Sequence, residues 1–287
     1  MASPKPIVVG IGELLWDIFP TGKRAGGAPA NFVYHASQFN TQGYAISAVG
    51  NDPLGNEILQ ALDDNRIAYI CEKTSYPTGV VNVTLTNGQP SYEIVEGVAW
   101  DHIPLSPKAE QIVAQADAVC FGSLALRNED SRRTITALLD KTPQEAIRFF
   151  DVNLRQHYYS KELIEMLLAK ANIFKINDDE LRVLAPMFDL TGNEHEQCRT
   201  LLEKYRLNYV VLTAGEKYST IYGKTEISRL DTPRVKVADT VGAGDSFSGA
   251  FVAGLLAGKP LRACHEQAVK TAAFVCTKTG AWPAYDK

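Results

Sequence analysis

Residues 239–247, with the sequence Asp-Thr-Val-Gly-Ala-Gly-Asp-Ser-Phe, combine a glycine-rich turn with a carboxylate. Gly242 and Gly244 lack a Cβ, so the backbone there can approach a ligand closely and adopt positive φ. Residues 246–256 are predicted to form a buried helix directly after the turn. The start of that helix would offer free N–H groups and the positive end of the helix dipole to an anion. This combination suggests transfer of a phosphoryl group.

Asp245 does not suit a simple phosphate cradle, because a carboxylate repels the phosphate. It suits a base that takes the proton of a hydroxyl attacking phosphorus. The alternative is an ordinary helix start with an acid in its first turn. Asp239 and Thr240 before the turn, and the small residues of 248–254 that would let the helix pack closely under a sheet, favour the catalytic interpretation.

The elements that must position this turn alternate between short apolar runs and helical patterns. The apolar runs predict buried strands at residues 7–9, 45–49, 118–121, 148–150, 173–176 and 209–212. Between about residues 108 and 208 the alternation is regular, which indicates parallel strands. We therefore expect an α/β fold with a doubly wound, mostly parallel sheet flanked by helices. No repeat or linker divides residues 1–287, so a single domain is expected.

Two segments, at about residues 13–25 and 78–99, break this pattern because they alternate polar and apolar residues with period two. Asn87-Gly88 is a hairpin signal within the second segment. Together they predict a small antiparallel β lid over the end of the main sheet where ligands of open α/β folds bind. Surface hairpins without a lid function are the alternative.

The composition excludes several classes of partner. Lys and Arg number 29 against 33 Asp and Glu, a net charge of −4, so no nucleic-acid surface is expected. The five cysteines are scattered and contain no Cys-x-x-Cys pair, which indicates neither a disulfide framework nor a zinc site. The apolar window at residues 249–257 is too short to span a bilayer, and the first residues do not resemble a secretory signal. We expect a soluble, cytoplasmic protein.

Two common nucleotide-binding motifs, the dinucleotide fingerprint and the Walker A loop, are absent from the sequence. Gly10 and Gly12 follow the first predicted strand, but Leu15 stands where a dinucleotide fingerprint has its third glycine. No Gly-x-x-x-x-Gly-Lys-Ser/Thr sequence occurs. A nucleotide site in this chain must therefore be of another design.

Gly26 and Gly27 lead into a predicted helix that carries Asn31. A polyol could approach the backbone at the glycines, and the Asn31 amide offers both a donor and an acceptor to neighbouring hydroxyls. Asp17 could accept hydroxyl hydrogens in the same way. The alternative is a tight strand-to-helix turn with no ligand.

Polar residues also follow two predicted parallel strands. Asp151, Asn153 and Arg155 alternate after residues 148–150, and we expect them on one side at the carboxyl end of the strand, where ligands bind. Residues 177–180, Asn-Asp-Asp-Glu, form an oxygen-rich turn that suits Mg²⁺. A helix N-cap followed by first-turn acids explains residues 177–180 equally well on local grounds.

In this order along the chain, the motifs resemble the PfkB/ribokinase family of carbohydrate kinases, and the resemblance covers nearly the whole sequence. It implies a ribokinase-like fold and ATP-dependent transfer of phosphate to a sugar. For catalysis it implies Asp245 as the base and Gly242, Ala243 and Gly244 as the anion hole. For the sugar it implies Asp17, Gly26, Gly27, Asn31 and Arg155. For the nucleotide it implies Asn177, Thr213, Gly215, Gly242 and Gly244, with Glu180 holding Mg²⁺ through water.

Residues 12–17, 99–101, 151–155 and 280–284 look most like the fructokinase group, which implies conversion of D-fructose to fructose 6-phosphate. A kinase for another sugar, a sugar acid such as 2-keto-3-deoxygluconate, or a nucleoside would share the catalytic residues. A sugar-binding regulatory protein without catalysis is the alternative from another class.

The resemblance also implies a monovalent-cation site, usually for K⁺, and Asp239 and Val241 match one side of it. Many family members form homodimers through their lids, but a small lid can instead close over its own domain. Tyr218 stands where the family's nucleotide motif has its last glycine, which puts the path of that loop in doubt.

Overall fold

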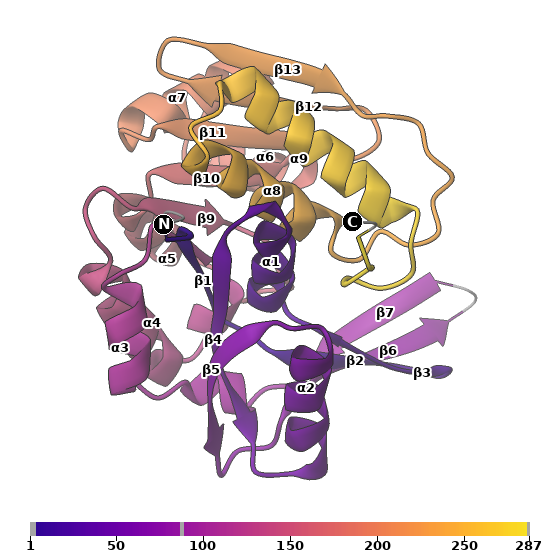
Figure 1. Cartoon of the computed structure of the whole chain (residues 1–287). Helices are drawn as coiled ribbons and strands as arrows, with labels where there is room; N and C mark the ends of the chain where they lie inside the picture. Colours follow the sequence, from indigo (N-terminus) through magenta and orange to yellow (C-terminus); the bar gives the residue numbers. More distant parts are fainter. Residues whose placement is uncertain (1–3, 87–88, 286–287) are drawn as a thin grey trace.

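The computed structural model describes residues 4–86 and 89–285, and over these residues its centre is a nine-stranded sheet (Figure 1). The strand order is β13-β12-β11-β10-β9-β8-β1-β4-β5. The strands are β1 (Ile7–Ile11), β4 (Gln42–Gly50), β5 (Ala68–Thr74), β8 (Ala118–Phe121), β9 (Ile147–Asp151), β10 (Ile173–Asn177), β11 (Tyr209–Ala214), β12 (Tyr218–Gly223) and β13 (Ile227–Asp231). All pairings from β5 to β11 are parallel, and those of β12 are antiparallel. The prediction of a mostly parallel sheet is confirmed.

All six predicted runs form strands, whereas β5, β12 and β13 were not predicted. β5 and β13 are the two edges of the sheet and are largely half-buried or exposed, so they lack a continuous apolar run. β12 is buried, but it carries Ser219 and Thr220, whose hydroxyls hide the strand pattern. The apolar-run criterion therefore detects buried strands made of apolar residues, and it misses edge strands and a buried strand that carries hydroxyl side chains.

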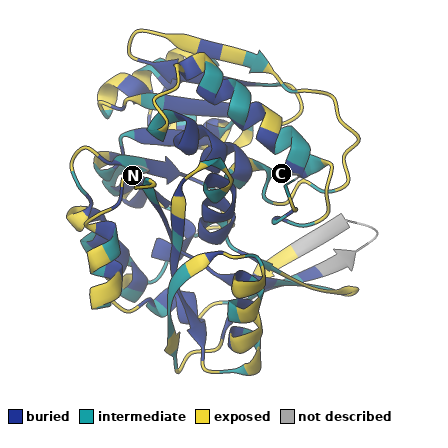
Figure 2. Cartoon of the chain, viewed as in Figure 1, coloured by how far each residue is buried: buried dark blue, intermediate teal, exposed yellow. Residues whose placement is uncertain are grey.

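Helices cover both faces of this sheet and enclose a separate core on each (Figures 1 and 2). One core involves α3 (Pro107–Val113), α4 (Glu129–Lys141), α5 (Lys161–Lys170), α6 (Asp178–Met187) and α7 (Glu194–Lys204). The other involves α1 (Ala28–Ala36), α2 (Pro53–Asp64), α8 (Ala243–Leu256) and α9 (Leu261–Cys276). In the described part of the chain, no helix is long and apolar enough to cross a membrane.

Helices α1 and α8 pack closely enough for backbone atoms to meet. A Cβ added at Gly249 in α8 would lie 2.6 Å from the carbonyl oxygen of Phe32 in α1, a distance that real Cβ atoms do not show. Only glycine allows this approach. The contact fixes the start of α8, which carries Asp245, relative to the start of α1, which carries Asn31.

A separate four-stranded small sheet has the order β3-β2-β6-β7. Its strands are β2 (Leu15–Phe19), β3 (Gly22–Gly26), β6 (Gly79–Thr86) and β7 (Gln89–Ile94). The β6–β7 hairpin is antiparallel, as predicted, and β2 forms a second antiparallel hairpin with β3, which was not predicted as a strand. The central β2–β6 pairing is parallel because the two hairpins run in the same sense. The predicted turn at Asn87-Gly88 lies outside the described residues.

A buried ion pair fastens the segment after β7 to the main body. Arg127 donates from Nε and Nη2 to the Asp101 carboxylate at 2.7 and 2.8 Å, and from Nη2 to the carbonyl of Val95 at 2.6 Å. The guanidinium also lies 4.0 Å from the centre of the Trp100 ring. The two charged side chains are 5% and 2% exposed.

We expect Arg127→Met to lower the free energy of unfolding by about 3–5 kcal/mol, because it leaves Asp101 buried without its cation. Arg133→Met is the matched control, since Arg133 pairs with Asp130 while its side chain is 74% exposed. Such an exposed pair contributes at most about 1 kcal/mol. Urea denaturation measures both values, and equal losses in the two variants would contradict the assignment.

Candidate active site

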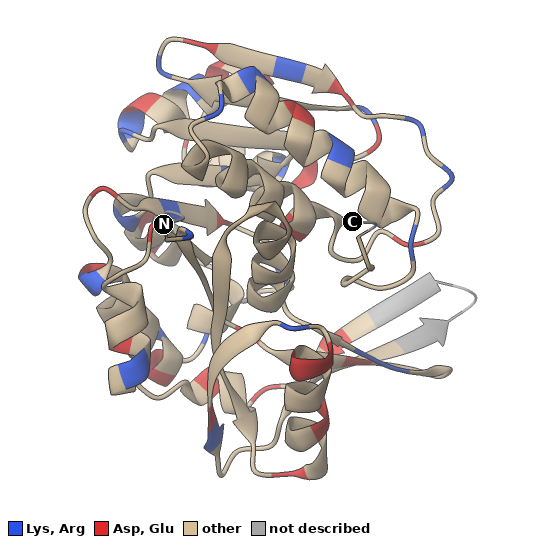
Figure 3. Cartoon of the chain, in the orientation of Figure 1, with Lys and Arg blue, Asp and Glu red and all other residues tan. Residues whose placement is uncertain are grey.

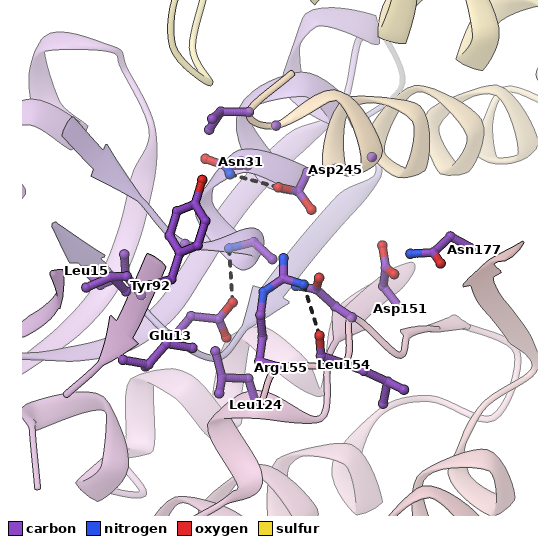
Figure 4. A pocket seen from close by; sticks show the side chains of 18 of the residues that line it. Glu13, Leu15, Asn31, Tyr92, Leu124, Asp151, Leu154, Arg155, Asn177 and Asp245 are labelled. Carbon is purple, nitrogen blue, oxygen red and sulfur yellow. Dashed lines mark hydrogen bonds between the residues drawn. The ribbon is translucent and has the colours of Figure 1, made fainter. Parts of the chain in front are cut away.

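A cavity of about 710 Å³ lies between the carboxyl ends of the parallel strands and the small sheet (Figure 4). β1, β9, β10 and β11 reach it with their ends or following loops, and α1 and α8 reach it with their first turns. The predicted site residues that line it are Asp17, Gly27, Asn31, Arg155, Asn177, Glu180, Thr213, Val241, Gly242, Gly244 and Asp245. Residues separated by more than 200 positions in the sequence thus meet around one space.

Four predicted site residues do not line this cavity, although the structure describes all of them: Gly26, Gly215, Ala243 and Asp239. A Cβ at Gly26 would lie 3.4 Å from the Asp17 carboxylate, so Gly26 leaves room beside that group. Gly215 lies in the turn between β11 and β12. The N–H of Ala243 donates to the carbonyl of Thr240 at 3.2 Å, so an anion would compete with this bond.

Asp245 is the third residue of α8 and lies in its first turn, after the N-cap residue Gly242. Its Oδ2 accepts a hydrogen bond from Asn31 Nδ2 at 2.8 Å (Figure 4). Burial, and to a smaller extent the charge of Asp151, raise the pKa of Asp245 to about 6, against the lowering effects of Asn31, Lys175 and Arg155. A carboxylate with this pKa is largely ionised at pH 7 and is more basic than an ordinary aspartate, which suits a general base.

Lys175 was not predicted as a site residue, yet it lines the cavity beside Gly244. Its Nζ lies 2.5 Å from Asp151 Oδ2, and a Cβ added at Gly244 would lie 3.4 Å from it. Burial alone lowers the pKa of Lys175, but Asp151 and then Glu180 and Asp245 outweigh burial, so the pKa is raised. Lys175 therefore carries a positive charge next to the predicted anion hole.

The sequence does contain a signal for Lys175, because a lysine interrupts the apolar run of β10 and lysine is almost never fully buried without a partner. The partner is Asp151, which also accepts from Ser248 Oγ at 3.3 Å. Asp151, Asn153 and Arg155 all line the cavity, as their alternation predicts. The Asp151 carboxylate is nevertheless occupied by protein donors.

Asn177 and Glu180 form the helix N-cap that was one of the two interpretations left open by the sequence. Asn177 caps α6, and the two residues form a reciprocal capping box, with side-chain to backbone distances of 2.8 and 2.9 Å. Glu180 Oε1 also accepts from the backbone N–H of Leu154 at 2.9 Å, which ties α6 to the loop carrying Arg155. Both residues line the cavity. The described residues contain no cluster of three metal-ligating side chains, so a divalent ion here would depend on water and phosphate oxygens.

Glu13 is a second site residue that was not predicted. It is buried, and its Oε1 accepts from the backbone N–H of Ala28 at 3.2 Å. It thereby caps α1, whose N-cap residue Gly27 has no side chain for this purpose. Burial raises the pKa of Glu13 to about 7. A Cβ at Gly27 would lie 2.2 Å from the Glu13 carbonyl oxygen, so this turn requires glycine.

Tyr218, which replaces a glycine of the family motif, does not disturb the turn between β11 and β12. It pairs with Ala214 at the first register position of the antiparallel β11–β12 ladder. Its ring lies 3.6 Å from the Arg229 guanidinium. The chain therefore turns tightly between β11 and β12, and Tyr218 does not enter the cavity.

One cavity of an α/β fold thus combines a glycine-rich helix start, a buried carboxylate and a charged lysine, which is the arrangement expected of a phosphotransferase. The chain belongs to the pfkB family of carbohydrate kinases, whose family model matches residues 12–287. It is therefore a sugar kinase, which transfers phosphate to an alcohol group.

Three relatives show the range of this similarity. A putative sugar kinase of Pyrococcus horikoshii, PH1459, is 28% identical, with 96% of this chain and 92% of the relative covered. Its crystal structure has a TM-score of 0.82, and a second structure of it is described as a complex with ATP. An ATP-dependent 6-phosphofructokinase of Thermoanaerobacterium thermosaccharolyticum is 27% identical, with 96% and 89% covered. Probable fructokinase-5 of Arabidopsis thaliana is 28% identical, with 87% and 83% covered.

Proposed function

We propose that the enzyme transfers the γ-phosphoryl group of ATP to D-fructose and produces fructose 6-phosphate. The observation that carries the proposal is the buried Asp245, which faces the same cavity as the helix start at Gly242 and Gly244 and the polar groups suited to a sugar. The fructokinase relative supports fructose as the acceptor. An ATP-dependent reaction also agrees with the cytoplasmic location expected from the sequence.

In this mechanism Asp17, Asn31 and Arg155, with the backbone at Gly27, hold the sugar. Asp245 takes the proton of the attacking hydroxyl, late in a loose transition state. N–H groups at the start of α8 and the Lys175 ammonium stabilise the charge on the phosphoryl oxygens. Asn177 and Thr213 line the side of the cavity proposed for ATP.

Mg²⁺ is the proposed metal, because it prefers phosphate, water and carboxylate oxygens and keeps several waters. Glu180 would hold it through water, since both carboxylate oxygens of Glu180 already accept backbone hydrogen bonds. The bound ion would neutralise part of the negative charge on the phosphate groups.

The small sheet is proposed to act as the lid of a single domain. Leu15, Val81, Tyr92 and Ile94 from this sheet line the cavity opposite the main sheet. Closure would exclude water that competes with the sugar for the phosphoryl group. In addition to the lid function, we propose that two chains form a homodimer through the small sheet. Light scattering that gives the mass of a monomer would reject the homodimer.

K⁺ beside Asp239 and Val241 is a further part of the proposal. The Asp239 carboxylate accepts from Arg24 at 2.7 Å, from Val241 N at 3.1 Å and from Gly280 N at 3.2 Å. A cation there would share the carboxylate with the Arg24 guanidinium. Equal rates in K⁺ and tetramethylammonium salts of the same ionic strength would reject a potassium requirement.

An acceptor-dependent ADP-release assay tests the substrate. D-Fructose, D-ribose, adenosine, 2-keto-3-deoxygluconate and fructose 6-phosphate are compared with ATP as donor, and the highest kcat/KM is expected for D-fructose. A higher value for fructose 6-phosphate would favour the activity named for the phosphofructokinase relative. ADP release with none of the acceptors, together with sugar binding, would favour a regulatory protein.

A further inference from the structure

Four hydrogen bonds dock residues 280–285 on α1, and three of them come from Tyr34 and His35. Tyr34 Oη donates to the carbonyl of Pro283 at 2.7 Å. His35 Nε2 lies 2.9 Å from the carbonyl of Ala281, and His35 Nδ1 lies 2.7 Å from Tyr285 Oη. Because a carbonyl only accepts, His35 donates from Nε2 and accepts at Nδ1. These three contacts hold the segment without using any residue that lines the cavity.

This docking brings Trp282 into contact with Asn31, the residue that donates a hydrogen bond to Asp245. Its indole Nε1 donates to Asn31 Oδ1 at 2.8 Å, and Asn31 Nδ2 donates to Asp245 Oδ2 at 2.8 Å. An indole can only donate and a carboxylate can only accept, so these two partners fix which end of the Asn31 amide faces Asp245. With the indole N–H removed, the amide is free to turn its oxygen toward Asp245.

We propose that Trp282 is a positioning residue for Asp245, acting through the Asn31 amide. The proposal rests on the proposed function only in naming Asp245 as the base; the hydrogen-bond chain itself does not depend on the sugar. Trp282 holds the amide so that a donor faces the carboxylate. It thereby favours the ionised form of Asp245, which is the form that can accept a proton.

The other groups around Asp245 make its ionisation sensitive to this donor. Asp151 from β9 and Glu13 from the loop after β1 disfavour the charge, whereas Lys175 from β10 and Arg155 from the loop after β9 favour it. Asp245 is itself buried. Loss of the amide donor therefore raises the pKa of Asp245 with little compensation from solvent.

The test compares Trp282→Phe with Tyr34→Phe. Both variants remove one hydrogen bond of the docked segment, but only Trp282→Phe releases Asn31. The carboxyl carbons of ¹³C-labelled aspartates are titrated by NMR in the enzyme without substrate, and Asp245 is assigned by its absence in Asp245→Asn. We expect the pKa of Asp245 to rise by about one unit in Trp282→Phe and to stay unchanged in Tyr34→Phe.

An unchanged Asp245 titration in Trp282→Phe, or equal shifts in both variants, would overturn the proposal. If Trp282→Phe does not fold, Trp282→Leu tests the same loss of the N–H. With ATP and D-fructose, the loss of kcat/KM in Trp282→Phe should be about fivefold greater at pH 6 than at pH 8, as a pKa moved from about 6 to about 7 requires. A changed contact between Asn31 and the sugar would lower kcat/KM equally at both pH values. Because the NMR titration needs no substrate, failure of the fructose assay leaves this result independent of the proposed function.

Discussion

Replacement of Asp245 by asparagine is expected to lower kcat by about 10²–10⁴-fold. Asparagine keeps the size of the side chain and can still hydrogen-bond, but it cannot accept a proton from the sugar hydroxyl. Sugar affinity should be largely retained, because the remaining polar groups of the cavity are unchanged. Steady-state kinetics measures kcat, and equilibrium binding measures the sugar affinity. Near-normal turnover would remove Asp245 from the mechanism.

The same assignment predicts a pH dependence. The pKa of Asp245 is raised to about 6, so the ionised base is lost as the pH falls through this value. The kcat/KM of the wild type should therefore decrease about tenfold per pH unit below pH 6. Glu13, with a pKa of about 7, is another buried acid of the cavity that would give such a limb. Glu13→Gln is the control, and the limb near pH 6 should persist in this variant.

Lys175→Met should reduce kcat by about 10²–10³-fold, because it removes a fixed positive charge beside the phosphoryl-binding helix start. The lysine acts on charge that grows in the transition state, so kcat should fall more than the affinity for ATP. Lys217→Met is the matched control: Lys217 pairs with Asp178, and its side chain lies mostly in solvent. A kcat equal to that of Lys217→Met would contradict a catalytic function of Lys175.

Loss of stability has to be separated from loss of catalysis in this variant. Lys175→Met leaves Asp151 buried without its cation, which costs about 3–5 kcal/mol of unfolding free energy. The double variant Asp151→Asn with Lys175→Met removes both charges and should recover much of that stability. If the double variant is stable but still slow, the rate defect belongs to the missing ammonium.

The fold was largely predictable because strands buried on both faces appear as apolar runs, and helices must connect parallel strands. Edge strands such as β5 and β13 bury too little to leave this signal. Alternation predicted the second hairpin of the small sheet and strand β2, but not strand β3 or the parallel β2–β6 pairing, since that pairing depends on where the two hairpins meet in space.

Candidate site residues were found where a local motif marks them, as at Gly27, Asn31 and Asp245. Lys175 lies in no such motif, and its significance comes from its contact with Asp151. Glu13 and Trp282 lie in segments that resemble the fructokinase group, at residues 12–17 and 280–284, but their contacts with the N–H of Ala28 and with Asn31 were not predicted. Such pairings are set by tertiary packing, which periodicity and motif spacing do not encode.

The backbone contact between α1 and α8 at Gly249 also bears on how this enzyme can change over evolution. The two helices that carry Asn31 and Asp245 meet through main-chain atoms, so substitutions of surrounding core side chains are expected to leave the alignment of these two residues unchanged. Gly249 is the exception, because an added methyl there would push the two helices, and with them Asn31 and Asp245, apart.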